Sequence, residues 1–290
     1  MKTGKAAVIL IGVLLTAALF AWAGSHGGTR VAGLPLFAGC VMLAFLIQWL
    51  AFLPAWLGHT ERFFDLVGSS TYIIVILLAL LLGGARDPRA VLLTLLVCFW
   101  AVRLGTFLYI RVHKQGGDGR FDSIKHSFQR FFITWSLQGL WVVITTAAAL
   151  AAITSASAVP MGFVGLLGLC LWLSGFLMET IADQQKLRFR SRPENRDTFI
   201  RDGLWAWSRH PNYFGEILLW CGIALIALPA LQGWQYLTLL SPVFVFLLLT
   251  RVSGIPLLEA RAEKRWGDDP AYQQWKNRTP RLVPRPPRKN

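Results

Sequence analysis

Two short stretches place acidic side chains at the edge of apolar runs, where a charge is costly. In METIADQQKLRFR, residues 178–190, Glu179 and Asp183 are four residues apart and would share one face of a helix. Lys186 and Arg190 continue this face. The acids adjoin the apolar run, where a charge deep in a membrane span costs roughly 2.5–3.5 kcal/mol. The pattern indicates either carboxylates that face a ligand or an ordinary solvated helix end with internal ion pairs.

The second stretch, SRHPNYFGE, precedes an apolar run beginning ILLWCG. Pro211 suits the first turn of a helix, where its missing N–H is not needed. Arg209 and His210 would then precede the helix, at the positive end of its dipole, where anions such as phosphate are favoured. A capped helix end at the membrane surface explains these three residues equally well.

That explanation does not extend to the polar residues further into the same helix. Asn212, Glu216 and Trp220 are spaced i, i+4 and i+8, so they form a single stripe. An amide followed by a carboxylate carries polar character into an apolar segment, which favours a functional role for Glu216.

A glycine-rich stretch, GGDGR, lies in the polar segment 109–130. A turn of this kind can bring backbone N–H groups near a phosphate, but the GxGxxG spacing and the preceding strand of a dinucleotide-binding motif are absent. We interpret the stretch as a flexible loop that offers Arg120 to an anion, with a plain surface loop as the alternative.

Further upstream, Arg103 lies within an apolar run and Tyr109 lies at its edge. Arg103 could extend its guanidinium to the membrane interface or pair with a carboxylate inside the bundle. Glu259 stands near the end of the last helical stretch. Together, the patches of acid and amide with arginines beside them predict one polar pocket at the inner leaflet. Its ligand would carry an anionic part toward the cytoplasm and an uncharged part toward lipid.

The elements that position these residues are membrane spans. Of the 290 residues, 54 % are hydrophobic and 15 % are charged, against about 25 % charged in soluble domains. The apolar runs that approach the roughly 20 residues of a transmembrane helix are 6–23, 34–53, 63–82, 90–108, 131–152, 159–178, 213–231 and 236–250. The sequence therefore predicts an all-α, polytopic bundle of seven or eight helices. The first run also fits a signal peptide, but the next span follows closely and we expect it to be retained.

The net charge of +14 follows the expected membrane sides. With eight spans and an inner N-terminus, the inner segments hold 25 of the 29 Lys and Arg residues, and the outer loops hold only Arg30, Arg86 and Arg89. This is the positive-inside pattern, so nucleic acid is not the predicted partner. Both termini are expected to be cytoplasmic, and the basic, proline-rich segment 281–290 is expected to lie on the surface. The four cysteines lie inside apolar runs, which predicts neither a disulfide nor a metal site.

Three stretches together resemble the C-terminal domain of the steroid 5-alpha-reductase superfamily, and most closely its branch of bacterial membrane proteins. They are ETIADQQKLRFR, GLWAWSRHPNYFGEILLW and SGIPLLE with AYQQWKNRTPRLVP, and the resemblance spans about residues 95–285. It implies a bundle that binds NADPH without a Rossmann fold and reduces a carbon–carbon double bond conjugated to a carbonyl. The expected enzyme is an oxidoreductase acting on CH–CH groups, like a 3-oxo-5-alpha-steroid 4-dehydrogenase, in a bacterial inner membrane. Its substrate would be lipophilic, steroid-like or isoprenoid.

The resemblance also implies roles for individual residues. Glu179 and Asp183 match a stripe that binds the adenosine part of the cofactor, and Arg190 matches a phosphate-binding arginine. Asn212 and Glu216 match the pair that holds the nicotinamide amide.

Other residues complete this implied site. Trp220 matches a tryptophan that faces the substrate, while Arg103 and Tyr109 resemble residues that line the cofactor. The remaining cofactor candidates are Arg120, Arg209, His210 and Tyr213. The catalytic candidates are Glu216 and Tyr109. Residues 91–290 would form the reductase-like domain with its cytoplasmic cofactor loops, and residues 1–90 the substrate side.

Two departures separate this chain from steroid-reducing members. Glu179 stands where the family has asparagine, and Trp100 stands where the carbonyl-polarising tyrosine would fall. An alternative is a relative of the isoprenylcysteine methyltransferases, which use S-adenosylmethionine and share the pattern from Arg209 to Gly215. These enzymes have an apolar residue in place of Glu216, which favours the reductase. A non-enzymatic lipid-binding protein would leave the buried acids without a purpose.

Overall fold

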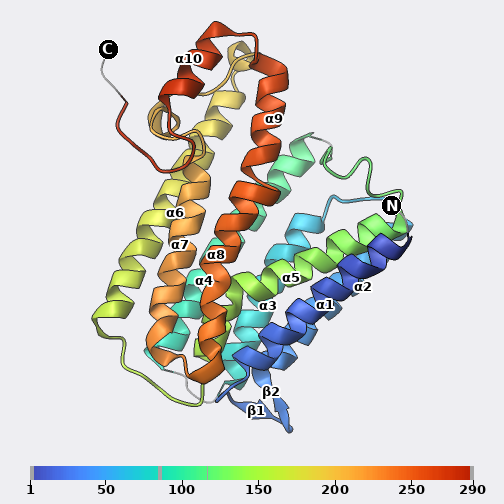
Figure 1. The fold of residues 1–290 in the computed structure, drawn as a ribbon, viewed down its shortest axis with the longest axis vertical. Helices are drawn as coiled ribbons and strands as arrows, with labels where there is room; N and C mark the ends of the chain where they lie inside the picture. The colour runs from blue at the N-terminus through green and yellow to red at the C-terminus, as the bar shows by residue number, and fades with distance from the viewer. Residues whose placement is uncertain (1–2, 84–86, 116, 288–290) are drawn as a thin grey trace. The chain divides into compact units, whose positions relative to one another are not determined.

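The computed structural model describes residues 3–83, 87–115 and 117–287, and these residues are mostly helical (Figure 1). Arg86 and Gly116, both part of the sequence predictions, lie outside them. The α-helices are α1 (Thr3–Gly24), α2 (Leu36–Leu57), α3 (Phe64–Leu82), α4 (Pro88–Gln115), α5 (Phe128–Ile153), α6 (Gly162–Arg190), α7 (Pro211–Ala227), α8 (Leu240–Leu247), α9 (Ile255–Trp266) and α10 (Pro270–Arg278).

Shorter elements connect the long helices. The 3-10 helices are η1 (Pro193–Asn195), η2 (Gly203–Ala206), η3 (Leu228–Ala230) and η4 (Gly233–Leu239), and η5 (Leu248–Val252) is a π-helix. The strands β1 (Arg30–Val31) and β2 (Leu34–Pro35) form a two-residue antiparallel pair. Ala32 and Gly33 connect them with φ angles of 49° and 82°, the left-handed backbone that a tight hairpin turn requires.

The described residues contain eight helical segments long and apolar enough to cross a membrane, which confirms the polytopic all-α prediction and its upper count. They are Gly4–Gly24, Leu36–Leu57, Phe64–Leu82, Pro88–Lys114, Phe128–Ile153, Gly162–Arg190, Pro211–Ala230 and Gly233–Trp266. The fourth, sixth and eighth extend well beyond the apolar runs from which they were predicted. Polar residues that follow an apolar run do not end a helix when they are good helix formers.

The chain forms two compact units. The first comprises Met1–Gly165 and Ala224–Ser241, and the second comprises Leu166–Ile223 and Pro242–Asn290. The division of roles predicted at residue 90 concerns substrate and cofactor, and it stays a prediction.

In the first unit, α5 is the central helix and packs against α1, α2, α3 and α4. Its C-terminal run from Ala147 to Ile153, AAALAAI, is entirely buried. Small side chains of this kind allow neighbouring helices to approach closely where hydrophobic burial supplies little driving force.

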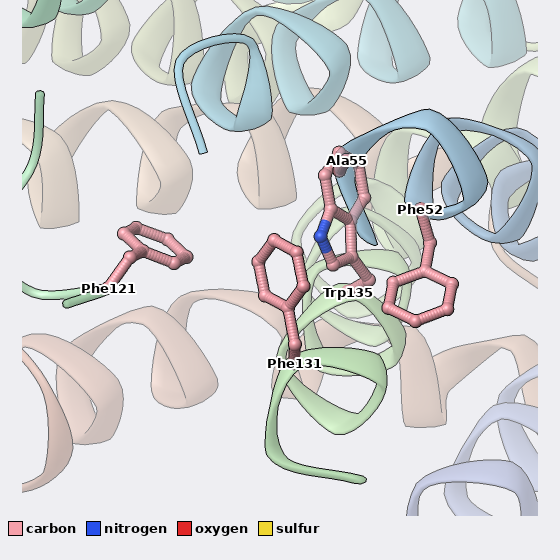
Figure 2. Packing of buried hydrophobic residues seen from close by; sticks show 5 residues of the cluster. All are labelled: Phe52, Ala55, Phe121, Phe131 and Trp135. Carbon is pink, nitrogen blue, oxygen red and sulfur yellow. The ribbon is translucent and has the colours of Figure 1, made fainter. Parts of the chain in front are cut away.

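An aromatic cluster joins α5 to α2 and to the loop that precedes α5. Phe52 and Ala55 come from α2, Phe121 from the loop, and Phe131 and Trp135 from α5 (Figure 2). The rings of Phe52 and Phe131 meet edge to face with centroids 5.8 Å apart. This geometry is favourable for aromatic pairs, and the buried Phe121 anchors the glycine-rich loop to the bundle.

Arg89, expected in a loop, lies instead in the first turn of α4 with a relative exposure of 1 %. Its guanidinium donates to the carbonyl oxygens of Val159, Pro160, Met161 and Ile226. A charged side chain this deeply buried is tolerated because its donors have acceptors.

Candidate functional site

Helices α6 and α7 cross with their backbones in contact, and this crossing positions the acidic residues. A Cβ atom added at Gly215 of α7 would lie 2.6 Å from both the backbone N of Glu179 and the carbonyl O of Gly175 on α6. A Cβ at Gly222 would lie 2.6 Å from the carbonyl O of Gly168. The order of these contacts makes the two helices antiparallel neighbours (Figure 1). Only glycine permits so close an approach.

The crossing brings together the two stripes predicted from the sequence. Glu179 lies at the level of Gly215, and the Nδ2 of Asn212 donates to the Oδ1 of Asp183 over 3.1 Å. Glu179, Asp183 and Glu216 have relative exposures of only 2 %, 8 % and 8 %. We call Glu179, Asp183, Asn212 and Glu216 the acid–amide patch.

Trp220 lies one turn further along α7 than Glu216 and is buried, with a relative exposure of 1 %. On the facing helix, the ring of Trp172 stacks on Phe176 at a centroid distance of 4.8 Å. The continuation of the patch along this helix crossing is therefore aromatic.

The segment before α7 is fixed to the end of α6. The indole N–H of Trp205 donates to the carbonyl of Ala182 over 3.1 Å, and the N–H of Leu204 donates to the Oε1 of Gln185 over 3.0 Å. Lys186 lies over the Trp205 ring, 4.6 Å from its centroid. These contacts hold the loop against the helix turn that carries Asp183.

An ion-pair cluster lies where α7 begins. The guanidinium of Arg209 is 2.7 Å from the Oε1 of Glu259, and the Nε2 of His210 is 3.4 Å from the same oxygen. Burial lowers the pKa of His210, and its hydrogen bond to Glu259 only partly opposes this effect. The His210 ring also stacks on Tyr213, with centroids 5.8 Å apart. Glu259 was a candidate from the sequence, but no residue pattern indicates that it is the partner of Arg209 and His210.

A cavity of about 230 Å³ opens beside the C-terminal end of α6. Its lining residues are Gln185, Arg188, Phe189, Arg192, Ile200, Asp202 and Gly203. The predicted phosphate-binding Arg190 belongs to the same helix end and is exposed. Arg188 and Arg192 were not predicted, although the alternating run KLRFRSR signals a basic helix end.

The remaining candidates belong to the first unit. Arg103 and Tyr109 lie on α4. Tyr109 has a relative exposure of 37 %, and its ring packs on that of His113 with centroids 3.9 Å apart. Arg120 forms ion pairs with Asp118 and with Asp65. Burial opposes ionisation of Asp118, but hydrogen bonds from the side chain and backbone of Arg120 outweigh it and lower the pKa of that carboxyl. That these residues share one site with the acid–amide patch stays a prediction.

The sequence of this chain is similar to those of known proteins. A family model described as "Protein of unknown function (DUF1295)" matches residues 51–279. The chain is also similar to proteins named 3-oxo-5-alpha-steroid 4-dehydrogenase 1. It is 37 % identical to the Bos taurus protein over 71 residues, which is 24 % of this chain and 27 % of that protein.

For the Homo sapiens protein the identity is 38 % over 60 residues, or 21 % of this chain and 23 % of the relative. For the Mus musculus protein it is 37 % over 68 residues, or 23 % and 26 %. The chain thus spans about a quarter of the length of these curated relatives. No solved structure matches it significantly. Because the family model covers most of the chain, the protein belongs to the DUF1295 family, which is the steroid 5-alpha-reductase-like family.

Proposed function

We propose that the protein is an integral membrane, NADPH-dependent reductase of a carbon–carbon double bond conjugated to a carbonyl. The substrate would be lipophilic, steroid-like or isoprenoid, and the names of the curated relatives favour a steroid. The acid–amide patch carries this proposal, because a chain with only 15 % charged residues buries three carboxylates at one helix crossing, beside a half-buried amide.

The chemistry of these donors and acceptors fits a nicotinamide dinucleotide. Carboxylates accept hydrogen bonds and do not bind phosphate, whereas the carboxamide of nicotinamide and the amino group of adenine both present N–H donors. Glu216 and Asn212 would hold the carboxamide, and Glu179 and Asp183 would accept from the adenosine part. The basic end of α6, with Arg190 exposed there, would hold the phosphates. Arginine also suits the 2′-phosphate that distinguishes NADPH from NADH.

When bound, the cofactor would supply the hydride. Glu216 and Asn212 would fix one face of its ring toward a substrate beside Trp220. The tight packing of α6 on α7 leaves the three carboxylates at most 8 % exposed, and low exposure to water strengthens the electrostatic contacts that they make. Tyr109 is our candidate for the donor that polarises the substrate carbonyl, where negative charge develops during reduction.

The cofactor side of the site is proposed to face the cytoplasm, in a bacterial inner membrane with both termini inside. Single cysteines at Glu194 and Ser157, both exposed, test this topology in a cysteine-free background. A membrane-impermeant maleimide added to intact cells should label the Ser157 variant only. Labelling of the Glu194 variant from outside would refute the topology.

The function itself is tested in two steps. Thermal unfolding of the detergent-purified protein with NADPH, NADH or S-adenosylmethionine should show stabilisation by NADPH above all. Stabilisation by S-adenosylmethionine alone would instead support the methyltransferase alternative. NADPH oxidation by proteoliposomes is then measured against lipophilic enones, including 3-oxo-4-ene steroids.

The variant Glu216→Gln should slow turnover of an active enone about ten- to a hundred-fold, as expected for the loss of one charge-assisted hydrogen bond worth about 1.5–3 kcal/mol. Glu263→Gln is the matched control, because Glu263 is half-exposed on α9 and pairs with Lys276. Wild-type turnover by Glu216→Gln would remove Glu216 from the proposed site.

A further inference from the structure

The C-terminal segment from Thr279 to Arg285 is bound to the residues that precede α7. The N–H of Arg209 donates to the carbonyl of Pro280 over 2.8 Å, and the N–H of Arg285 donates to the carbonyl of Trp207 over 3.0 Å. Between them, the hydroxyl of Ser208 donates to the carbonyl of Leu282 over 2.7 Å. The composition of this tail predicts a surface segment unable to fold alone. The contacts make it a strap across residues 207–209.

One carboxylate joins this strap to the rest of the second unit. The Oε2 of Glu259 is 3.2 Å from the Nε of Arg281 in the strap, and its Oε1 receives Arg209 and His210. The Glu259 side chain is 23 % exposed, so bulk water screens these pairs only in part. Glu259 therefore ties together three segments that are distant in sequence: α9, the strap and the residues before α7.

The tied residues determine where α7 begins. The N–H of Phe214 donates to the carbonyl of His210 over 3.2 Å, so the first helical turn is built on His210. Asn212 lies within that turn and Glu216 lies one turn later. A shift of His210 would therefore be transmitted along the helix to both residues of the acid–amide patch.

We propose that Glu259 is a positioning residue of the cofactor site: it holds the C-terminal strap across residues 207–209 and so fixes the start of α7. Glu259 acts through Arg209, His210 and Arg281, and it need not touch the cofactor. The effect on dinucleotide affinity rests on the function proposed above, whereas the effect on the strap does not.

The experiment compares Glu259→Gln with Glu263→Gln. Glu263 lies one turn further along α9, and its carboxylate binds Lys276 at 2.5 Å and Gln273 at 3.0 Å, neither of which belongs to the strap or to residues 207–210. Both variants remove one paired carboxylate from the same helix. Glu259→Asp keeps the charge on a shorter side chain and should restore part of the wild-type behaviour. Arg281→Gln cuts only the strap contact at a half-exposed side chain and serves if Glu259→Gln does not fold.

Two quantities are measured on the 290-residue chain in detergent: hydrogen exchange at the amides of Arg209 and Arg285, and the dissociation constant for NADPH. We expect Glu259→Gln to speed exchange at both amides and to weaken NADPH binding about ten-fold, comparable to the loss of one hydrogen bond to a charged group. Glu263→Gln should change neither. Unchanged protection of the α6 amides from Leu166 to Phe176, which belong to the same unit as Glu259, shows that this unit is folded.

Wild-type exchange at Arg209 and Arg285 in Glu259→Gln would overturn the strap. Faster exchange with unchanged affinity would overturn the positioning role, and weaker binding with unchanged exchange would make Glu259 a direct contact instead. If the wild-type protein does not bind NADPH at all, the proposed function fails. In that case the exchange measurement still decides whether Glu259 holds the strap.

Discussion

Replacing Gly215 by alanine tests whether the α6–α7 crossing positions the acid–amide patch. The new Cβ would lie 2.6 Å from the backbone of both Glu179 and Gly175, and backbone atoms cannot rotate away as a side chain can. Ordinary van der Waals contact begins at 3.4 Å, so the helices would have to part by about 0.8 Å at this point. Overpacking of a buried site typically costs about 1–3 kcal/mol. Alanine recovers up to about 1 kcal/mol of helix propensity.

We therefore expect Gly215→Ala to lower the free energy of unfolding by up to about 2 kcal/mol, and by about 1–3 kcal/mol relative to a glycine-to-alanine change at an open helix position. Gly12→Ala on α1 is the matched control, because a Cβ there would meet nothing within 4 Å. It should be neutral or stabilising, by up to about 1 kcal/mol. Unfolding by SDS in mixed micelles, followed by tryptophan fluorescence, gives both values.

The reciprocal variant Gly175→Ala sharpens the test. Its Cβ would lie 2.5 Å from the carbonyl of Gly215, so it forces the same two backbones apart. Once one alanine has separated the helices, the second should cost less, and the double variant should lose less stability than the sum of the single variants. If Gly215→Ala is as stable as Gly12→Ala, or if the two losses add fully, the helices are not in backbone contact and the geometry assigned to the patch is wrong.

Three further outcomes are expected. Arg89→Met should lower the free energy of unfolding by at least about 2 kcal/mol, because the carbonyls buried around the guanidinium lose their donor. An unchanged free energy of unfolding in the same SDS assay would contradict the hydrogen-bonding role of Arg89. Burial lowers the pKa of His210 below its unfolded value of 6.5, so the unfolded chain takes up the proton first as the pH falls. The contribution of His210 to the free energy of unfolding is therefore present above pH 6.5 and is lost as the pH falls through the folded-state pKa. Thermal unfolding between pH 8 and pH 5 should accordingly be less pH-dependent in His210→Gln than in wild type. Asn212→Asp would set a second carboxylate beside Asp183, where the amide now lies 3.1 Å from it, and NADPH titration should show weaker binding than for wild type.

The membrane spans could be predicted from the sequence because length and apolarity alone determine which segments cross a bilayer. Their ends could not. Helix α6 continues to Arg190 and α4 continues to Gln115, well past their apolar runs, because hydropathy records where a helix leaves the apolar layer and not where its hydrogen bonds stop.

The candidate site was predictable only within each helix. Spacing of i, i+4 placed Glu179 with Asp183 and Asn212 with Glu216. The contact between the two pairs depends on Gly175 and Gly215, which are 40 residues apart in a chain that contains 26 glycines. Three hydrogen bonds that anchor the C-terminal strap are accepted by the backbone carbonyls of Pro280, Leu282 and Trp207, for which side-chain identity carries no signal. Long-range contacts of this kind follow from the packed fold.

The second unit contains acidic side chains in two different environments, one exposed to solvent and one buried. Glu263 shows what an ordinary helix-end acid does here: its side chain is 46 % exposed and pairs with Lys276. Glu179, Asp183 and Glu216 are at most 8 % exposed, beside a helix crossing that only glycines permit. Removing a carboxylate from water costs several kcal/mol unless partners offset it, and stability alone would favour apolar residues at these positions. A helix end that served only to anchor the protein would therefore resemble Glu263, and on this ground we propose that the three carboxylates buried at one crossing belong to a site for a ligand with N–H donors.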